Sequence, residues 1–284
     1  MTGDERGELQ GRVALVTGAA RGQGRSHALR LAAEGAAIIA IDVCGPVGNT
    51  PYAPATADDL RRTAELVRSS GGAIVADTVD VRDLAAVTAA VARAAAELGG
   101  LDIVVANAGI AGGAPITEMD AGAWQTMIDV DLTGVWNTVK ASVPVMLAQT
   151  IDRQRSIVLI SSANGGLKAP PNLSHYAAAK HGVIGLMRSL ANELGPQGIR
   201  VNSVHPTAVD TSMIHNEFTY RLFRPDLQAP GRADVIELFE SFHSLPIPWI
   251  EPIDVSNAVA FLASDRSRMI TGVTLPVDGG LSSR

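Results

Sequence analysis

Short runs of β-branched and small apolar residues alternate along the chain with longer stretches whose apolar residues recur at helical spacing. Strands are expected over residues 12–17, 36–42, 72–80, 101–109, 156–162, 199–206 and 273–278. Helices are expected over residues 25–34, 58–69, 84–98, 123–146, 175–194 and 255–263. Because strands that alternate with helices pair in parallel, the pattern predicts a single α/β domain over residues 1–284, with a doubly wound parallel sheet and helices on both faces.

Two long stretches follow neither pattern. Residues 43–57 are rich in proline and glycine and come directly after the second strand, and residues 207–253 contain several prolines. Long irregular segments in compact domains are usually functional or disordered. We expect the first to form an insertion over a bound cofactor and the second to form the substrate loop region.

Length and composition narrow the class of protein. The chain has 284 residues, 46% of them hydrophobic and 18% charged, which suits one large domain. Its formal net charge of -6 offers no excess positive field to phosphates, so neither nucleic acid nor an anionic membrane is expected as a partner. The single cysteine, Cys44, cannot form an internal disulfide, and residues 1–11 lack the apolar core of a secretory signal. No apolar run reaches membrane-spanning length, and we expect a cytoplasmic protein with a small-molecule ligand.

The first strand leads into a glycine-rich turn, TGAARGQG, which contains Gly18, Gly22 and Gly24. Glycine lets the backbone approach a pyrophosphate closely, and the N–H groups at the start of the next helix attract the anion. Without the other motifs, the three glycines could equally form a tight turn that binds nothing. The turn lacks the Gly-Lys-Ser/Thr ending of nucleoside-triphosphatase loops, so phosphoryl transfer is not expected.

An acidic residue, Asp42, closes the second strand. A carboxylate at this position can accept hydrogen bonds from both hydroxyls of an adenosine ribose and would repel a 2'-phosphate, which predicts NAD rather than NADP. Arg21 is the one feature that would favour NADP, although a lone arginine in a turn is more often solvated.

Tyr176 and Lys180 lie four residues apart in SHYAAAKHG, a spacing that places both on one face of a helix. The lysine cation should stabilise the phenolate and lower the tyrosine pKa, which would make Tyr176 a usable general acid or base. Ser162 ends the expected strand 156–162 at the ligand-binding edge of the sheet, where its hydroxyl can hold a substrate oxygen. Tyr-x-x-x-Lys pairs are common on exposed helices and usually have no function. Here the pair follows the glycine-rich turn, the strand-end Asp42 and Ser162 in order, and this order of motifs rarely arises by chance.

The glycine-rich turn, the strand-end Asp42, the tripeptide NAG at residues 107–109 and the Ser162, Tyr176 and Lys180 set together resemble the short-chain dehydrogenase/reductase family over residues 11–280. The resemblance implies a seven-stranded Rossmann sheet, with Tyr176 as acid/base, Lys180 on the nicotinamide ribose and Ser162 polarising the carbonyl. It places Asp80 and Val81 at the adenine, and Asn107 and Gly109 beside the adenine ribose. The residues expected at the cofactor are Gly18, Arg21, Gly22, Gln23, Gly24, Asp42, Val43, Asp80, Val81, Asn107, Gly109, Tyr176, Lys180, Pro206, Val209 and Thr211.

The segments RGQGRSHA, the insertion at 43–57 and residues 246–265 followed by TGVTLPVDGG resemble more narrowly the mycofactocin-associated, carveol-dehydrogenase-like subfamily. This resemblance implies an alcohol dehydrogenase or ketone reductase for apolar, terpenoid-like secondary alcohols. It also implies a tightly held NAD that is reoxidised in place by the carrier mycofactocin, and a homotetramer paired through long helices.

The chain departs from the family pattern at two positions. Asp131, in VDLTG, replaces the asparagine that helps to hold a water molecule next to the lysine, and we count it among the catalytic candidates. The usual Pro-Gly after the sixth strand is Pro206-Thr207, although Val209 and Thr211 stand where the nicotinamide carboxamide would be held.

Three other functions are weighed against this prediction. A dinucleotide-sensing regulator with the same fold would have no need of Ser162, Tyr176 and Lys180. A serine hydrolase is disfavoured because SSANG is not a G-x-S-x-G elbow. His175, His181 and His205 lack the spacing of a metal site, so no metal is expected, and His205 is either a cleft residue or a structural histidine.

Overall fold

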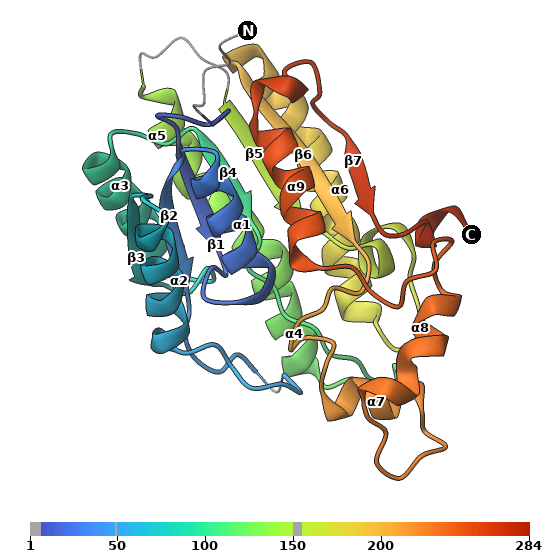
Figure 1. Ribbon diagram of the computed structural model, residues 1–284. Helices are drawn as coiled ribbons and strands as arrows, with labels where there is room; N and C mark the ends of the chain where they lie inside the picture. Colours follow the sequence, from blue (N-terminus) through green and yellow to red (C-terminus); the bar gives the residue numbers. More distant parts are fainter. Residues whose placement is uncertain (1–6, 49, 150–154) are drawn as a thin grey trace, which may run out of the picture.

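The computed structural model describes residues 7–48, 50–149 and 155–284. A seven-stranded parallel sheet with the order β3-β2-β1-β4-β5-β6-β7 forms its centre (Figure 1). The strands are β1 (Val13–Thr17), β2 (Ala37–Asp42), β3 (Ile74–Thr78), β4 (Ile103–Ala106), β5 (Arg155–Ile160), β6 (Ile199–Pro206) and β7 (Thr274–Val277). The strand order reverses between β1 and β4, which is where ligands bind in open α/β sheets. The predicted doubly wound fold is confirmed.

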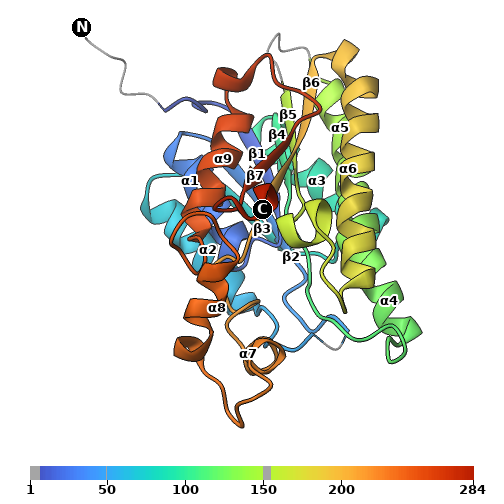
Figure 2. The ribbon, with the colours of Figure 1, turned by 90° about the vertical axis from the view of Figure 1, so that its right-hand side faces the viewer.

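Helices cover both faces of the sheet (Figure 2). One layer contains α1 (Gly22–Ala33), α2 (Ala57–Ser69) and α9 (Pro252–Ala263), and the other contains α3 (Leu84–Leu98), α5 (Gly134–Leu147) and α6 (Ser174–Leu194). Each layer encloses its own apolar core. Along β1, Val13 and Leu15 belong to one core, and Ala14 and Val16 belong to the other. A strand buried on both faces is apolar along most of its length, which explains the hydrophobic run at residues 13–16.

The helix expected over 123–146 is interrupted, so that prediction was wrong in this respect. It consists of α4 (Ala121–Ile128), a π-helical turn at Asp129–Thr133 and α5. The wider π turn is a common feature of functional sites because it redirects side chains within a helix. Here it places Asp131 in the interior, where its side chain has no exposed surface.

The region 207–253 contains regular elements that the sequence analysis did not predict: α7 (Glu217–Phe223) and α8 (Ile236–Ser241). Both lie beyond the carboxyl ends of the strands, at the lower edge of the views in Figures 1 and 2. The two ends of the region meet, because Val209 and Ile250 form a parallel bridge. None of the helices in the described part of the chain combines the length and apolar character needed to cross a membrane.

Candidate active site

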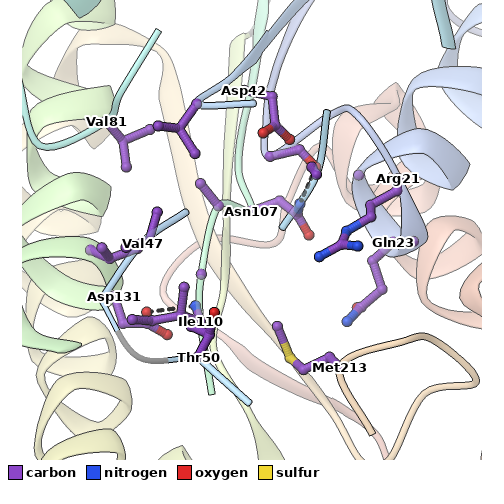
Figure 3. Close-up of a pocket in the computed structure, with 18 of the residues that line it drawn as sticks. Arg21, Gln23, Asp42, Val47, Thr50, Val81, Asn107, Ile110, Asp131 and Met213 are labelled. Atoms are coloured by element: carbon purple, nitrogen blue, oxygen red, sulfur yellow. Dashed lines mark hydrogen bonds between the residues drawn. The ribbon is translucent and has the colours of Figure 1, made fainter. Parts of the chain in front are cut away.

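A pocket opens at the carboxyl ends of the central strands, around the β1–β4 switch point, and most of the predicted site residues line it. The predicted residues that line it are Gly18, Arg21, Gly22, Gln23, Gly24, Asp42, Val43, Asp80, Val81, Asn107, Gly109, Asp131, Tyr176, Lys180 and Thr211. Figure 3 shows Arg21 and Gln23 on one side of this pocket and Val47 and Asp131 on the opposite side.

The glycine-rich turn is built so that side chains other than hydrogen would not fit. Gly18 has a φ of 66°, and a Cβ added there would lie 2.9 Å from the Cα of Ala108. A Cβ at Gly24 would lie 1.9 Å from the carbonyl oxygen of Gly18. Helix α1 follows at once, and its N-cap residue Arg21 makes no side-chain hydrogen bond to the first turn. The first N–H groups of α1 therefore remain free of side-chain caps, which suits a pyrophosphate.

Asp42 ends β2 as predicted and is held in one orientation. Its Oδ2 accepts a hydrogen bond from the N–H of Ala20 at 3.0 Å, and its Oδ1 accepts one from the N–H of Cys44 at 3.0 Å. A carboxylate has about four acceptor positions. The two contacts leave acceptor positions on a residue that lines the pocket, and these can receive ribose hydroxyls.

Lys180, which lies on α6, is the centre of a buried polar cluster. Its Nζ lies 3.1 Å from Oδ2 of Asp131 and donates to the carbonyl of Ile160 at 3.2 Å. Asp131 also accepts the N–H of Ile110 at 2.8 Å, an interaction drawn in Figure 3. The lysine Nζ is 5.7 Å from the ring centre of Tyr176, and the Ser162 side chain interacts with the Tyr176 hydroxyl in a way that lowers its pKa. The helical spacing of four thus brings phenol and ammonium together.

The electrostatics of the cluster correct one expectation. Burial raises the pKa of Tyr176; the Lys180 cation lowers it, as predicted, but burial together with the Asp131 carboxylate keeps it above its ordinary value. Burial by itself lowers the pKa of Lys180, yet Asp131 and Tyr176 outweigh it, so the pKa is raised. The ammonium is therefore the stable form of the lysine.

Three predicted residues do not line the pocket formed by the described residues: Ser162, Pro206 and Val209. Ser162 follows β5 by two residues rather than ending it, and it acts on the site by lowering the pKa of Tyr176. The side chain of Val209 is buried in the apolar core, and its backbone forms a bridge with Ile250.

The side chains of Asn107 and Thr207 are hydrogen-bonded to other parts of the protein. The amide nitrogen of Asn107 donates to the carbonyl of Thr17 at 2.9 Å, which joins β4 to the glycine-rich turn. Thr207, at the usual glycine position, lies 2.8 Å from Nε2 of His243 through its hydroxyl. His243 Nδ1 donates to the carbonyl of Ile247 at 2.9 Å, and in the neutral ring Nε2 then accepts from the threonine hydroxyl.

Several lining residues belong to the insertion that was expected over the cofactor, and Tyr52 is the most informative of them because its contacts were not predicted. Its hydroxyl accepts the N–H of Ala111 at 3.1 Å, and its ring centre lies 5.8 Å from the guanidinium of Arg21. Arg21 also donates to the carbonyl of Ala53. The described part of 43–57 is thereby joined both to the glycine-rich turn and to the loop after β4. A contact between a hydroxyl and a distant backbone amide leaves no signal in the sequence.

The class of protein follows from four features: a doubly wound sheet, a glycine turn before an uncapped helix, a strand-end carboxylate, and a half-buried tyrosine beside a buried lysine. Together they define a dinucleotide-binding oxidoreductase. Comparison with known proteins narrows this class. The family described as enoyl-(acyl carrier protein) reductase matches residues 18–282. The chain belongs to the short-chain dehydrogenase/reductase family.

Relatives of this chain include the (-)-trans-carveol dehydrogenase of Rhodococcus erythropolis, which is 54% identical over 96% of this chain and 98% of its own length. A crystal structure of carveol dehydrogenase from Mycobacterium avium in complex with NAD is 55% identical, with a TM-score of 0.95 over 98% of this chain and 100% of that one. A short-chain dehydrogenase from Mycobacterium paratuberculosis bound to NAD is 42% identical, with a TM-score of 0.89 over 98% and 100% of the two chains. These comparisons confirm the predicted family and fold, and NAD, the predicted cofactor, is named in both structures.

Proposed function

We propose that this protein is an NAD-dependent alcohol dehydrogenase that interconverts an apolar secondary alcohol and its ketone. The observation that carries the proposal is the cluster in which Lys180 Nζ lies 5.7 Å from the ring centre of Tyr176 and 3.1 Å from Asp131, with Ser162 lowering the pKa of the same tyrosine. An acid/base group, its supporting cation and a hydroxyl donor are what hydride transfer at a carbinol carbon requires from the protein.

The fit to NAD rests on this chain's own residues. Gly18, Gly22 and the uncapped start of α1 would hold the pyrophosphate, and Asp42 would accept the adenosine ribose hydroxyls. Lys180 would bind the nicotinamide ribose. When bound, NAD supplies the carbon that accepts or returns the hydride.

The roles of the cluster follow from its contacts. In alcohol oxidation, Ser162 holds the substrate oxygen by a hydrogen bond, and the Tyr176 oxygen takes the hydroxyl proton as the hydride leaves the carbon. The Lys180 ammonium stabilises the phenolate that performs this step. In ketone reduction the same tyrosine returns the proton to the carbonyl oxygen.

An apolar substrate is favoured by the region 207–253. Four of its aromatic rings pack together, with centroid distances of 4.8 Å for Phe223–Phe239, 5.8 Å for Phe239–Phe242 and 6.2 Å for Phe239–Trp249. Met213 from the same region lines the pocket. The carveol dehydrogenases at 54% and 55% identity support a cyclic, terpenoid-like alcohol as substrate.

The proposal extends to how NAD is kept and how the chain assembles. The contacts of Tyr52 and Arg21 support an insertion that covers the cofactor and retains NAD. Reoxidation in place by mycofactocin is proposed from the resemblance of the sequence to its subfamily. Exposed apolar side chains on α5, Trp136 and Leu147, support a homotetramer paired through long helices. The expected location is the cytoplasm.

The direct test supplies the purified protein with NAD, with carveol and simpler secondary alcohols, and with an artificial electron acceptor. Ketone formation that is lost in Tyr176→Phe supports the proposal. A protein that binds NAD but turns over none of these alcohols would instead be a dinucleotide-sensing regulator. The intact Ser162, Tyr176 and Lys180 cluster favours the enzyme over this alternative.

A further inference from the structure

A buried histidine on β6, His205, lies directly behind the serine of the catalytic cluster. Its side chain has no exposed surface. Its Nδ1 is 3.2 Å from the carbonyl oxygen of Ser162, and its Nε2 is 2.8 Å from the hydroxyl of Ser203. Ser203 and His205 are two residues apart and therefore share one face of the strand.

The two contacts define the protonation of the ring. A carbonyl oxygen can only accept a hydrogen bond, so Nδ1 carries the proton and donates a hydrogen bond to the carbonyl of Ser162. Nε2 is then the acceptor, and the Ser203 hydroxyl donates to it. Burial lowers the pKa of His205 to about 4, so the ring is neutral at physiological pH and keeps this tautomer.

The carbonyl of Ser162 thus has both of its acceptor positions used. The N–H of Gly166 donates to it at 2.8 Å from within the following π turn, Ala163–Leu167, and His205 donates from the neighbouring strand. The turn packs closely on the ring, since a Cβ added to Gly166 would lie 3.1 Å from His205 Nδ1. The Gly166 contact is local to the turn, whereas the His205 contact joins Ser162 to the sheet.

We propose that His205 is a positioning residue that fixes the backbone of Ser162 and so aims its hydroxyl at Tyr176 and the substrate oxygen. The inference rests on the proposed function, because it assigns His205 an effect only through Ser162. Catalytic groups must be held within a fraction of an ångström of their productive geometry, so loss of one anchor should reduce the rate constant more than binding.

The test compares His205→Leu, which removes the donor, with His205→Asn, whose side-chain N–H can take the place of Nδ1–H. We expect His205→Leu to lower kcat by about 10-fold with the NAD dissociation constant unchanged, and His205→Asn to recover most of the loss. Both variants are then made in a Ser162→Ala background. If His205 acts through Ser162, the effect of His205→Leu on kcat disappears there.

The matched control is His243→Leu, which removes another buried, doubly bonded histidine that contacts no member of the catalytic cluster. Its effect on kcat, whatever its size, should be the same in both backgrounds. A His205→Leu loss that is equally large without Ser162, or an unchanged kcat, would overturn the inference. If His205→Leu does not fold, Ser203→Ala replaces it, with a smaller loss of kcat that also disappears in Ser162→Ala. An unchanged kcat in Ser162→Ala itself would count against the proposed function instead.

Discussion

Asp131 Oδ2 lies 3.1 Å from Lys180 Nζ, and neither side chain is more than 5% exposed. Burial raises the pKa of Asp131 and Lys180 lowers it, and in its ionised form the carboxylate acts on the same cation that lowers the pKa of Tyr176. An asparagine would keep the hydrogen bond from the N–H of Ile110 through its carbonyl oxygen but would bring no charge. The substitution seen in the sequence is thus an electrostatic change within a preserved geometry.

The first prediction concerns the pH dependence of Asp131→Asn. Burial and Asp131 raise the pKa of Tyr176, and Lys180 lowers it, so removing the carboxylate lowers the tyrosine pKa. Alcohol oxidation requires the phenolate, and its rate should therefore rise at lower pH in the variant. Lys180 also loses the carboxylate that raises its pKa, which should narrow the profile on the alkaline side. The measurement is kcat/KM against pH, and a profile that does not move would show that Asp131 is only structural.

The second prediction is that Tyr176→Phe lowers the chemical rate by at least about 10²-fold, because general acid/base catalysis supplies about 10² to 10⁴. The ring and its packing remain, so the melting temperature and the affinity for NAD should change little. Single-turnover kinetics with a matched alcohol provide the measurement. Turnover close to the wild-type rate would contradict the acid/base role of Tyr176.

The third prediction is that Asp42→Ala weakens the binding of NAD by about 2 to 4 kcal/mol, since two charged hydrogen bonds to the ribose are lost. The preference for NAD over NADP should also decrease, because the charge that repels a 2'-phosphate is gone. The contacts of Asp42 with Ala20 and Cys44 add a local loosening of the turn. Asp42→Asn is the matched variant, because it keeps an acceptor while removing the charge. Titration with both cofactors measures the effect, and an unchanged ratio of the two affinities would rule out the ribose contact.

The fourth prediction concerns exchange of NAD beneath the insertion. Tyr52→Phe loses the hydrogen bond from Ala111, which is about 1 kcal/mol, and should speed NAD release by about 5-fold. Replacement of 43–57 by a short Gly/Ser turn should speed it by about 10²- to 10³-fold, because the apolar cover is also lost. The off-rate and the NAD that co-purifies are measured together.

Tyr220→Phe is the control for this experiment. It also removes a hydroxyl that is hydrogen-bonded, to His215 at 2.9 Å, but it lies outside the pocket. Its NAD off-rate should equal that of the wild type. Wild-type protein that is isolated without cofactor and turns over rapidly with added NAD would refute the retention of NAD and leave the dehydrogenase activity untouched.

The elements that were predicted best have local signals at both ends. The predicted bounds of α3, 84–98, agree with the structure, because Asp83 caps its first turn and Gly99 ends it in a left-handed conformation. The π turn at Asp129–Thr133 was missed because the apolar spacing on either side of it is helical. Helix α7 was missed because it is short and lies between prolines, although Asn216 caps it.

The candidate site likewise contains residues that the sequence predicted and contacts that it could not predict. The glycine turn, Asp42 and the Tyr176–Lys180 pair depend on short spacings, which a sequence displays directly. The bonds from Tyr52 to Ala111 and from His205 to Ser162 join segments 59 and 43 residues apart, and one partner in each is a backbone group. Backbone groups are present at every position, so residue type cannot identify them as partners.

The bridge between Val209 and Ile250 gives the chain a modular construction. The two ends of the substrate region meet at one place, where Ile250 N–H donates to Ala208 and Asp210 N–H donates to Ile250, and its residues Ser244 and Leu245 also donate to the carbonyl of Gly279. A loop whose ends are already joined can be exchanged without altering the spacing of the elements outside it. A chimera that carries residues 210–249 of a relative should therefore fold on this scaffold and inherit the alcohol preference of its donor.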